Sequence, residues 1–244
     1  MTVTRADIAL LRPVRDGNAF EDTVERVLRV IKLGVVSVGE RLPPERELAL
    51  RLGVSRVTLR EAIRALQEAG YVESRRGRYG GTFVRTVPSP PRRRARRTAA
   101  QLLSRHGGDT LDDVLTYRQV LEVGAAETAA NRQLTAPAVR HLRAMLARTT
   151  AAAPADYRRC DSRLHLAVAE LTGSPLTTAA VADARTKVNE LLDAIPLLAG
   201  NITHSDHQHE RIVAAIAGGN APAARAAMAE HLDGSSALLR GFLQ

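Results

Sequence analysis

The sequence predicts a mainly α-helical protein that has an N-terminal winged helix-turn-helix domain and a C-terminal all-α helical bundle. The first 86 residues contain two short helical patterns and a glycine-rich hairpin pattern. Residues 98–244 repeat apolar side chains at helical spacing, without the sustained alternation that is typical of strands. Residues 1–97 hold 21 Lys and Arg against 11 Asp and Glu, whereas residues 98–244 hold 14 against 15. This asymmetry indicates a basic module that binds nucleic acid and a near-neutral module with another task.

The segment LPPERELALRLGVSRVTLR, residues 42–60, predicts two short helices joined by a tight turn. Pro43 and Pro44 can begin the first helix, and Gly53 can end it with a left-handed residue. Ser55 is suited to cap the second helix. One face of that second helix is apolar and another is basic. The apolar stripe comprises Leu59, Ala62, Ile63 and Leu66, and the basic face comprises Arg56, Arg60 and Arg64.

Three further patterns complete the expected organisation. A helix is predicted from Glu21 to Leu33, where apolar residues recur at helical spacing. Residues 71–74 and 82–85 read as the strands of a hairpin with the glycine-rich tip RRGRYGG. The segment VPSPPRRRARR predicts a linker, because its prolines disfavour helix. The predicted boundaries are 1–86 for the winged helix-turn-helix domain, 87–97 for the basic linker and 98–244 for the helical domain.

The composition excludes several classes of protein. No apolar run approaches the roughly 20 residues that are needed to span a bilayer. The N-terminus lacks a secretory signal pattern, and the single Cys160 rules out an internal disulfide. We therefore expect a cytoplasmic protein with no membrane partner.

The second domain is predicted to consist of helices whose ends follow glycine and proline positions. They are expected near residues 98–106, 110–131, 136–151, 155–172, 176–199, 204–218 and 221–242. Asp161 and His165 are four apart and share one helix face, while His209 and His231 lie on stripes expected to face the interior. Arg118 also lies on an inward stripe, where an unpaired charge would be costly. A single histidine on such a stripe is more often a core residue than a metal ligand.

Two sets of residues match a known family. The segments GERLPPERELALRLGVSRVTLREAIRALQEAG and GRYGGTFV resemble the DNA-binding domain of GntR-type bacterial transcription regulators. The second domain is similar to the FCD domain of the FadR-like branch of these regulators, which binds effectors and forms dimers. The residues that carry this second similarity are Arg118 with Glu122, Asp161 with His165, His209 with Ile212 followed by AAIAGGN, and His231 with Leu232.

The resemblance implies which side chains of the first domain contact DNA. Arg56 and Arg60 would reach base edges, since arginine pairs bidentately with guanine, and hydroxyl groups near the helix N-terminus would contact phosphate. Arg76 and Gly77 at the hairpin tip would enter the adjacent minor groove, where the negative potential attracts arginine. The full implied set is Arg46, Ser55, Arg56, Thr58, Arg60, Arg76 and Gly77.

The resemblance also implies a metal site in the second domain. Its ligands would be Asp161, His165, His209 and His231. Three imidazoles and one carboxylate suit zinc first, with nickel, iron or manganese as alternatives. Arg118 and Asn189 are the candidates for binding an effector. An alternative role for Arg118 is an ion pair with Glu122, four residues further on.

These patterns predict a ligand-responsive transcription regulator and not an enzyme, since no matching general base or nucleophile accompanies the predicted metal site. A homodimer is expected to bind a pseudo-palindromic operator in double-stranded DNA through paired winged helices. The resemblance implies that the effector is a small organic acid, a carboxylate bound at the metal-containing pocket. One alternative is a regulator whose effector is the metal ion itself. Another alternative, from a different class, is a metallohydrolase with a basic arm.

Overall fold

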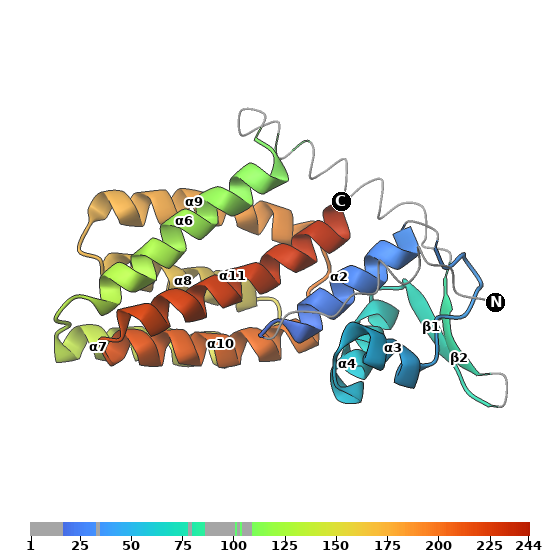
Figure 1. Ribbon diagram of the computed structural model, residues 1–244. Helices are drawn as coiled ribbons and strands as arrows, with labels where there is room; N and C mark the ends of the chain where they lie inside the picture. Colours follow the sequence, from blue (N-terminus) through green and yellow to red (C-terminus); the bar gives the residue numbers. More distant parts are fainter. Residues whose placement is uncertain (1–16, 33–34, 78–79, 86–100, 102, 104–108) are drawn as a thin grey trace. The chain divides into compact units, whose positions relative to one another are not determined.

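The structure of the protein is a computed structural model that describes residues 17–32, 35–77, 80–85, 101, 103 and 109–244 (Figure 1). The chain forms two compact units. The first unit comprises residues 1–98, 198–201 and 234–244, and the second comprises 99–197 and 202–233. The expected linker, residues 87–97, lies outside the described residues, so the predicted domain boundaries stay a prediction.

The first unit contains the predicted winged helix-turn-helix. Its elements are α2 (Ala19–Lys32), α3 (Glu45–Leu52), α4 (Arg56–Glu68), β1 (Val72–Arg75) and β2 (Gly81–Val84). The two strands are antiparallel, and Val72 lies opposite Val84. The segment before α3 adds to this sheet, because Arg41 forms a bridge with Phe83 and the Leu42 N–H donates to the Thr82 carbonyl at 2.8 Å. The sequence patterns did not predict this third strand-like segment.

The turn between α3 and α4 has the predicted chemistry. Gly53 ends α3 with a φ of 68°, in the left-handed region that favours glycine. Ser55 caps α4, and its hydroxyl accepts a hydrogen bond from the Thr58 N–H at 3.0 Å. The predicted apolar stripe of α4 is buried, so the helix presents its arginines on the opposite face. The helix-turn-helix prediction is therefore confirmed.

The C-terminal residues pack within the first unit against α2 and the wing. The rings of Tyr71 and Phe242 meet edge to face, with centroids 5.8 Å apart. Gly241 lies so close to α2 that a Cβ atom built on it would be 3.1 Å from the Glu25 Cα. Gly234, seven residues earlier on the same helix, would place a Cβ atom 2.6 Å from the Asn18 Oδ1. The two glycines therefore allow close packing between the helices.

The second unit is a helical bundle, as predicted (Figure 1). Its helices are α6 (Leu111–Ala130), α7 (Ala136–Thr150), α8 (Tyr157–Glu170) and α9 (Pro175–Asp193), together with most of α10 (Ala199–Ala217) and about half of α11 (Ala221–Leu243). Aliphatic side chains from α6, α7, α8, α10 and α11 form a core cluster in the part of this unit that the structure describes. The expected helix near 98–106 lies mostly outside the described residues. None of the described helices has the length and apolar character that crossing a membrane requires.

Two neighbouring helix ends were predicted wrongly. A single helix was expected over residues 176–199, but α9 ends at Asp193 and α10 begins at Ala199. Pro196 explains the break, because proline lacks a backbone N–H and restricts the residue before it. As a result α10 begins five residues earlier than expected and carries His204, His207 and His209.

Candidate metal centre and nucleic-acid interface

Four side chains from three helices meet in the interior of the second unit. Asp161 and His165 come from α8, His209 from α10 and His231 from α11. All four are buried, and one ligand atom from each lies within 4.8 Å of the others. The structure thus brings together every residue that the resemblance assigned to the metal site.

The three imidazoles and the carboxylate point toward one another. The Nε2 atom of His209 lies 3.2 Å from the Asp161 Oδ1 and 3.3 Å from the His231 Nε2. The Nε2 atom of His165 lies 3.6 Å from the same Asp161 oxygen. Three ring nitrogens therefore surround one carboxylate oxygen, which is a suitable donor set for a single cation.

Two of the imidazoles are oriented by acceptors on their outer side. The Nδ1 atom of His165 pairs with the Glu122 Oε2, and the Nδ1 atom of His231 lies 3.1 Å from the Gln208 Oε1. A proton on each Nδ1 leaves the lone pair on Nε2, which faces the centre. Histidine ligands of metals usually have such outer partners, which set their tautomer and orientation.

The electrostatics of the buried cluster favour neutral imidazoles at two positions. Burial lowers the pKa of His209, and burial together with the other histidines lowers the pKa of His231 well below its usual value. Burial also acts to lower the pKa of His165, but the Glu122 and Asp161 carboxylates together outweigh it and raise this pKa. Burial would raise the pKa of Asp161, yet Arg185 and His165 hold it well below its usual value. Asp161 is therefore ionised and available as a ligand.

Two buried arginines balance the carboxylates. Arg118 pairs with Glu122 at 3.0 Å, and both side chains are almost fully buried. Arg185 on α9 donates to Asp161 and lies 3.9 Å from Glu122. Arg185 was not among the residues predicted from the sequence, although it lies in register with the buried Val181 and Val188 of its helix. An arginine on that apolar stripe was the signal that could have found it.

One unpaired nitrogen in the buried cluster supports a cation site. His165 Nε2 is buried and has no hydrogen-bond partner among the residues that the structure describes. An unpaired buried nitrogen that faces two other imidazole nitrogens and a carboxylate is costly without a ligand. Three nitrogens and one oxygen fit zinc, and they also suit nickel, iron or manganese.

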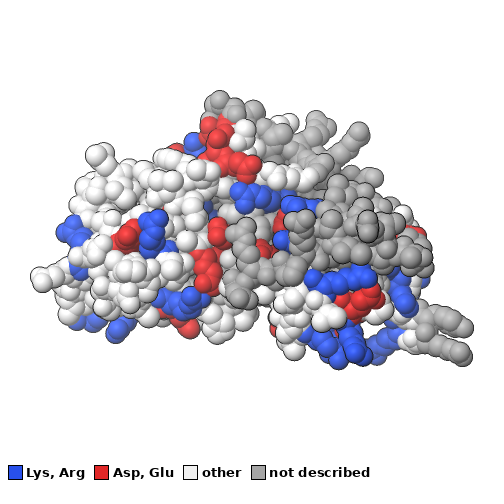
Figure 2. Space-filling view, viewed as in Figure 1, with Lys and Arg blue, Asp and Glu red and all other residues white. Residues whose placement is uncertain are grey.

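The predicted DNA-contacting residues form an exposed basic surface in the first unit. Figure 2 shows Lys and Arg atoms gathered over the region of α4 and toward the wing strands. Arg60 Nε pairs with Glu45 Oε2 at 2.8 Å, and because both side chains are solvent-exposed this pair contributes little to stability. Thr58 is partly buried, and Gly77 has a φ of 103° that glycine adopts readily. The exposed members of the predicted set are Arg46, Ser55, Arg56, Arg60, Arg76 and Gly77.

Comparison with known proteins gives the family. Residues 20–84 match the family described as bacterial regulatory proteins, gntR family, and residues 113–234 match the FCD domain. The chain belongs to the GntR family. Its members and relatives are transcription regulators, so the prediction of a regulator that is not an enzyme is confirmed. The metallohydrolase alternative is thereby set aside.

Individual relatives of this GntR-family chain differ in how much they match. A protein named for regulation of the L-lactate dehydrogenase operon in Escherichia coli (strain K12) is 31% identical over 216 residues, which are 87% of this chain and 83% of that protein. RmpR of Mycobacterium gastri is 57% identical over 67 residues, so the match spans 28% of this chain and 24% of that relative. The structure of Streptococcus agalactiae GntR is 24% identical, covers 89% of this chain and 98% of its own, and has a TM-score of 0.44.

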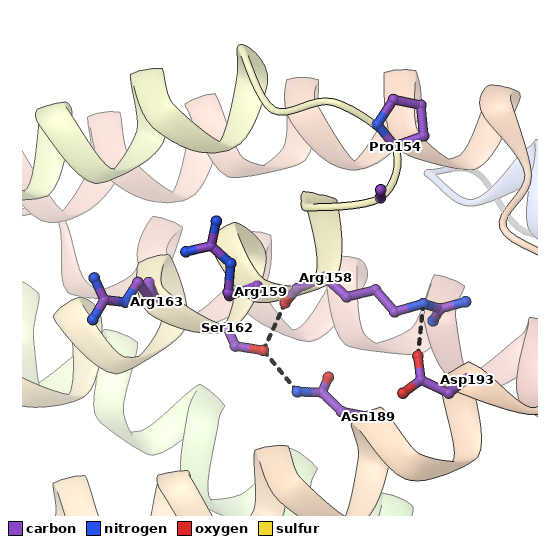
Figure 3. A pocket seen from close by; sticks show the side chains of 8 residues that line it. Pro154, Arg158, Arg159, Ser162, Arg163, Asn189 and Asp193 are labelled. Atoms are coloured by element: carbon purple, nitrogen blue, oxygen red, sulfur yellow. Dashed lines mark hydrogen bonds and ion pairs between the residues drawn. The ribbon is translucent and has the colours of Figure 1, made fainter.

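The two effector-binding candidates of this GntR-family chain lie in different surroundings. Arg118 is fully buried beside Glu122, as the alternative prediction had it. Asn189 instead lines a surface cavity of about 530 Å³ between α8 and α9, here called the α8–α9 pocket (Figure 3). The other lining residues are Pro154, Ala155, Arg158, Arg159, Ser162, Arg163 and Asp193. Arg118 is not among them.

Proposed function

We propose that this GntR-family regulator acts as a homodimer that binds a pseudo-palindromic operator and responds to a small organic acid. In this proposal residues 1–86 bind DNA, residues 87–97 link the domains and residues 98–244 bind the effector and dimerise. The proposed place of action is the cytoplasm. The observation that carries the ligand-responsive part is the convergence of four ligand atoms within 4.8 Å in a buried cluster.

The proposed metal site consists of Asp161, His165, His209 and His231. The bound ion, with zinc as the first choice, supplies Lewis acidity and an open coordination position for an acidic group. Glu122 and Gln208 hold two imidazoles with Nε2 facing inward. The nitrogen lone pairs are therefore available without rearrangement of the side chains.

The proposed DNA contacts follow from the exposed face of the recognition helix and from the wing. Arg46, Arg56 and Arg60 would contact bases, and Ser55 and Thr58 would contact phosphates. The wing tip, Arg76 with Gly77, would enter the minor groove. One winged helix contacts only a half-site, and two symmetric copies match a palindrome, which supports the homodimer.

The effector is proposed to be a small carboxylate. The Escherichia coli relative named for the L-lactate dehydrogenase operon supports an organic acid. Arg118 and Asn189 are the proposed contacts. The second candidate function is a regulator whose effector is the metal ion, which the buried cluster also supports.

Operator binding by metal-free and zinc-loaded protein tests the proposal. The operator would first be selected from random DNA, and light scattering of the complex should give two chains of 26.3 kDa for each operator. Binding that changes with L-lactate only in the zinc-loaded protein would support the acid. A change caused by zinc alone would favour the metal as effector. A monomer on the operator, or an affinity that responds to neither zinc nor acid, would contradict the proposal.

A further inference from the structure

The α8–α9 pocket has an excess of positive charge that its own residues do not neutralise. Its lining includes three arginines and one aspartate. Arg158 is engaged, because its Nε lies 3.2 Å from the Asp193 Oδ1 and its Nη2 donates to the Ile195 carbonyl at 3.3 Å. Arg163 forms no ion pair with any residue in the described part of the chain. One guanidinium is therefore left for a ligand.

A second guanidinium is held only weakly. Arg159 pairs with Asp156 at 2.9 Å, but both side chains are more than half exposed, and such surface pairs are weak. Arg159 and Arg163 are four residues apart on α8, where like charges repel each other. Figure 3 shows both guanidinium groups on the same side of Ser162, while Arg158 extends in the other direction toward Asp193. An anion bound between the two arginines would remove the repulsion.

The floor of the pocket contacts the network that holds the metal-binding carboxylate. Ser162 Oγ accepts hydrogen bonds from Asn189 Nδ2 at 2.8 Å and from Arg185 Nη2 at 3.1 Å. Its own hydroxyl donates to the Arg158 carbonyl at 2.8 Å. The same Nη2 of the buried Arg185 also donates to Asp161 Oδ2. A single guanidinium group therefore joins the pocket floor to Asp161.

We infer that the α8–α9 pocket binds a small dianion, either a dicarboxylate or a phosphate ester, and that binding there is coupled to the metal centre through Ser162 and Arg185. This inference rests on the proposed metal site and adds a second anion site, on the side of Asn189, that is separate from the open coordination position of the ion. The volume of about 530 Å³ lies within the usual range for small-molecule sites, roughly 300 to 1,000 Å³. The arginine pair accepts two acidic groups, which favours a dianion over a monocarboxylate.

The coupling has a physical route and a direction. The arginine pair lies on α8, which also carries Asp161 and His165. An anion that shifts this helix therefore also moves two of the side chains that bind the metal. Negative charge added at the pocket favours a divalent cation nearby. Zinc affinity should therefore rise by about fivefold or more when the pocket is filled, and reciprocity requires the same factor for the anion.

Calorimetry on the full-length protein tests the pocket, with succinate and inorganic phosphate as separate probes. The double variant Arg159→Gln/Arg163→Gln should weaken succinate binding by at least about tenfold, since two charge-assisted contacts are lost. Its zinc content should not change. The matched control Arg143→Gln removes an exposed arginine of α7 that does not line the pocket, and it should bind succinate like the wild type. Tighter binding of phosphate than of succinate would assign the natural ligand to the phosphate esters.

The coupling is tested by zinc competition against a chromophoric chelator, with and without succinate. Ser162→Ala keeps both arginines but removes the contact with Arg185, so it should still bind succinate while losing most of the effect on zinc affinity. Equal zinc affinity with and without succinate in the wild type would refute the coupling. Zinc-loaded wild-type protein that binds neither probe would refute the pocket. Equal affinity of the wild type and the double variant for the probes would refute it as well. Succinate binding that depends on the arginine pair in a protein that takes up no added zinc would instead refute the metal site and leave the pocket standing.

Discussion

The Nε2 atoms of His209 and His231 lie 3.3 Å apart inside the second unit, and Asp161 Oδ1 is 3.2 Å from the first of them. The partner of His231 on its other side is Gln208, which fixes the proton on Nδ1 and leaves a lone pair on Nε2. Helices α10 and α11 thus present ring nitrogens to one point. Hydrogen bonds alone do not pair all the inward nitrogens, because His165 Nε2 has no such partner in the described part of the chain.

The first prediction is that His209→Ala removes the metal. The protein should retain less than about one tenth of the wild-type zinc, since one of the four protein ligands is lost. Elemental analysis after gel filtration measures this directly. His207→Ala is the matched control, because His207 is exposed on the same helix and should leave the zinc content unchanged. Full zinc occupancy in His209→Ala would show that these are only core histidines.

The second prediction concerns pH and the metal-free protein. The pKa values of His209 and His231 are lowered in the folded state, so below about pH 6.5 the unfolded chain binds protons that the folded chain does not. The free energy of unfolding should therefore fall as the pH decreases from 7 to 5. His165 acts in the opposite direction, because its raised pKa gives stability that is lost as the pH rises.

Urea unfolding in the presence of a chelator measures this pH dependence. The double variant His209→Gln/His231→Gln should show a smaller loss of stability between pH 7 and 5 than the wild type. The same loss in both proteins would mean that other groups cause the acid sensitivity.

The third prediction is that Glu122→Gln destabilises the second unit and weakens metal binding. Removing one partner of a buried ion pair costs about 3 to 5 kcal/mol, because the charge of Arg118 is left uncompensated. His165 also loses its charged outer partner, which should reduce metal affinity by about 10- to 100-fold. Glu127→Gln removes a partly exposed carboxylate of the same helix, paired with Arg225, and should change stability by less than about 1 kcal/mol. Similar unfolding curves for the two variants would contradict the role assigned to Glu122.

The fourth prediction concerns the recognition helix. Arg56→Ala and Arg60→Ala should each abolish specific operator binding while the fold and the dimer remain, because both side chains are exposed on the face opposite the core stripe. Each lost base contact should cost about 1 to 3 kcal/mol for every half-site. Titration of labelled operator DNA measures the affinity, and Arg143→Ala serves as a charge-matched control in the second unit. Unchanged affinity of both helix variants would overturn the assignment.

The fifth prediction compares two helical glycines. Gly124 has no atom within 4 Å of a built Cβ, so Gly124→Ala should raise stability by about 0.5 to 1 kcal/mol. Gly241→Ala has the same intrinsic gain but places its Cβ 3.1 Å from the Glu25 Cα, and such overpacking typically costs about 1 to 3 kcal/mol. Thermal unfolding should therefore rank the two variants on opposite sides of the wild type. Equal stabilisation by both substitutions would show that α11 does not pack tightly against α2.

Local sequence determined much of this protein. Gly53 and Ser55 specify the turn of the helix-turn-helix, because left-handed backbone and an N-cap hydroxyl are requirements of individual residues. The spacing of apolar residues predicted both the buried face of α4 and the inward positions of His209 and His231, since helical periodicity depends only on neighbours along the chain. Pro196 also encodes the break between α9 and α10 locally, although a single helix was predicted over this region.

Only the tertiary structure decided which groups meet across helices. Arg185 and Gln208 contact Asp161 and His231 from 24 and 23 residues away along the chain, and no local spacing predicts such pairs. The placement of Asn189 in the α8–α9 pocket, apart from the buried Arg118, is likewise a result of packing. Periodicity determines which face of a helix is buried, whereas the identity of the opposite group depends on how separate helices pack around a common core.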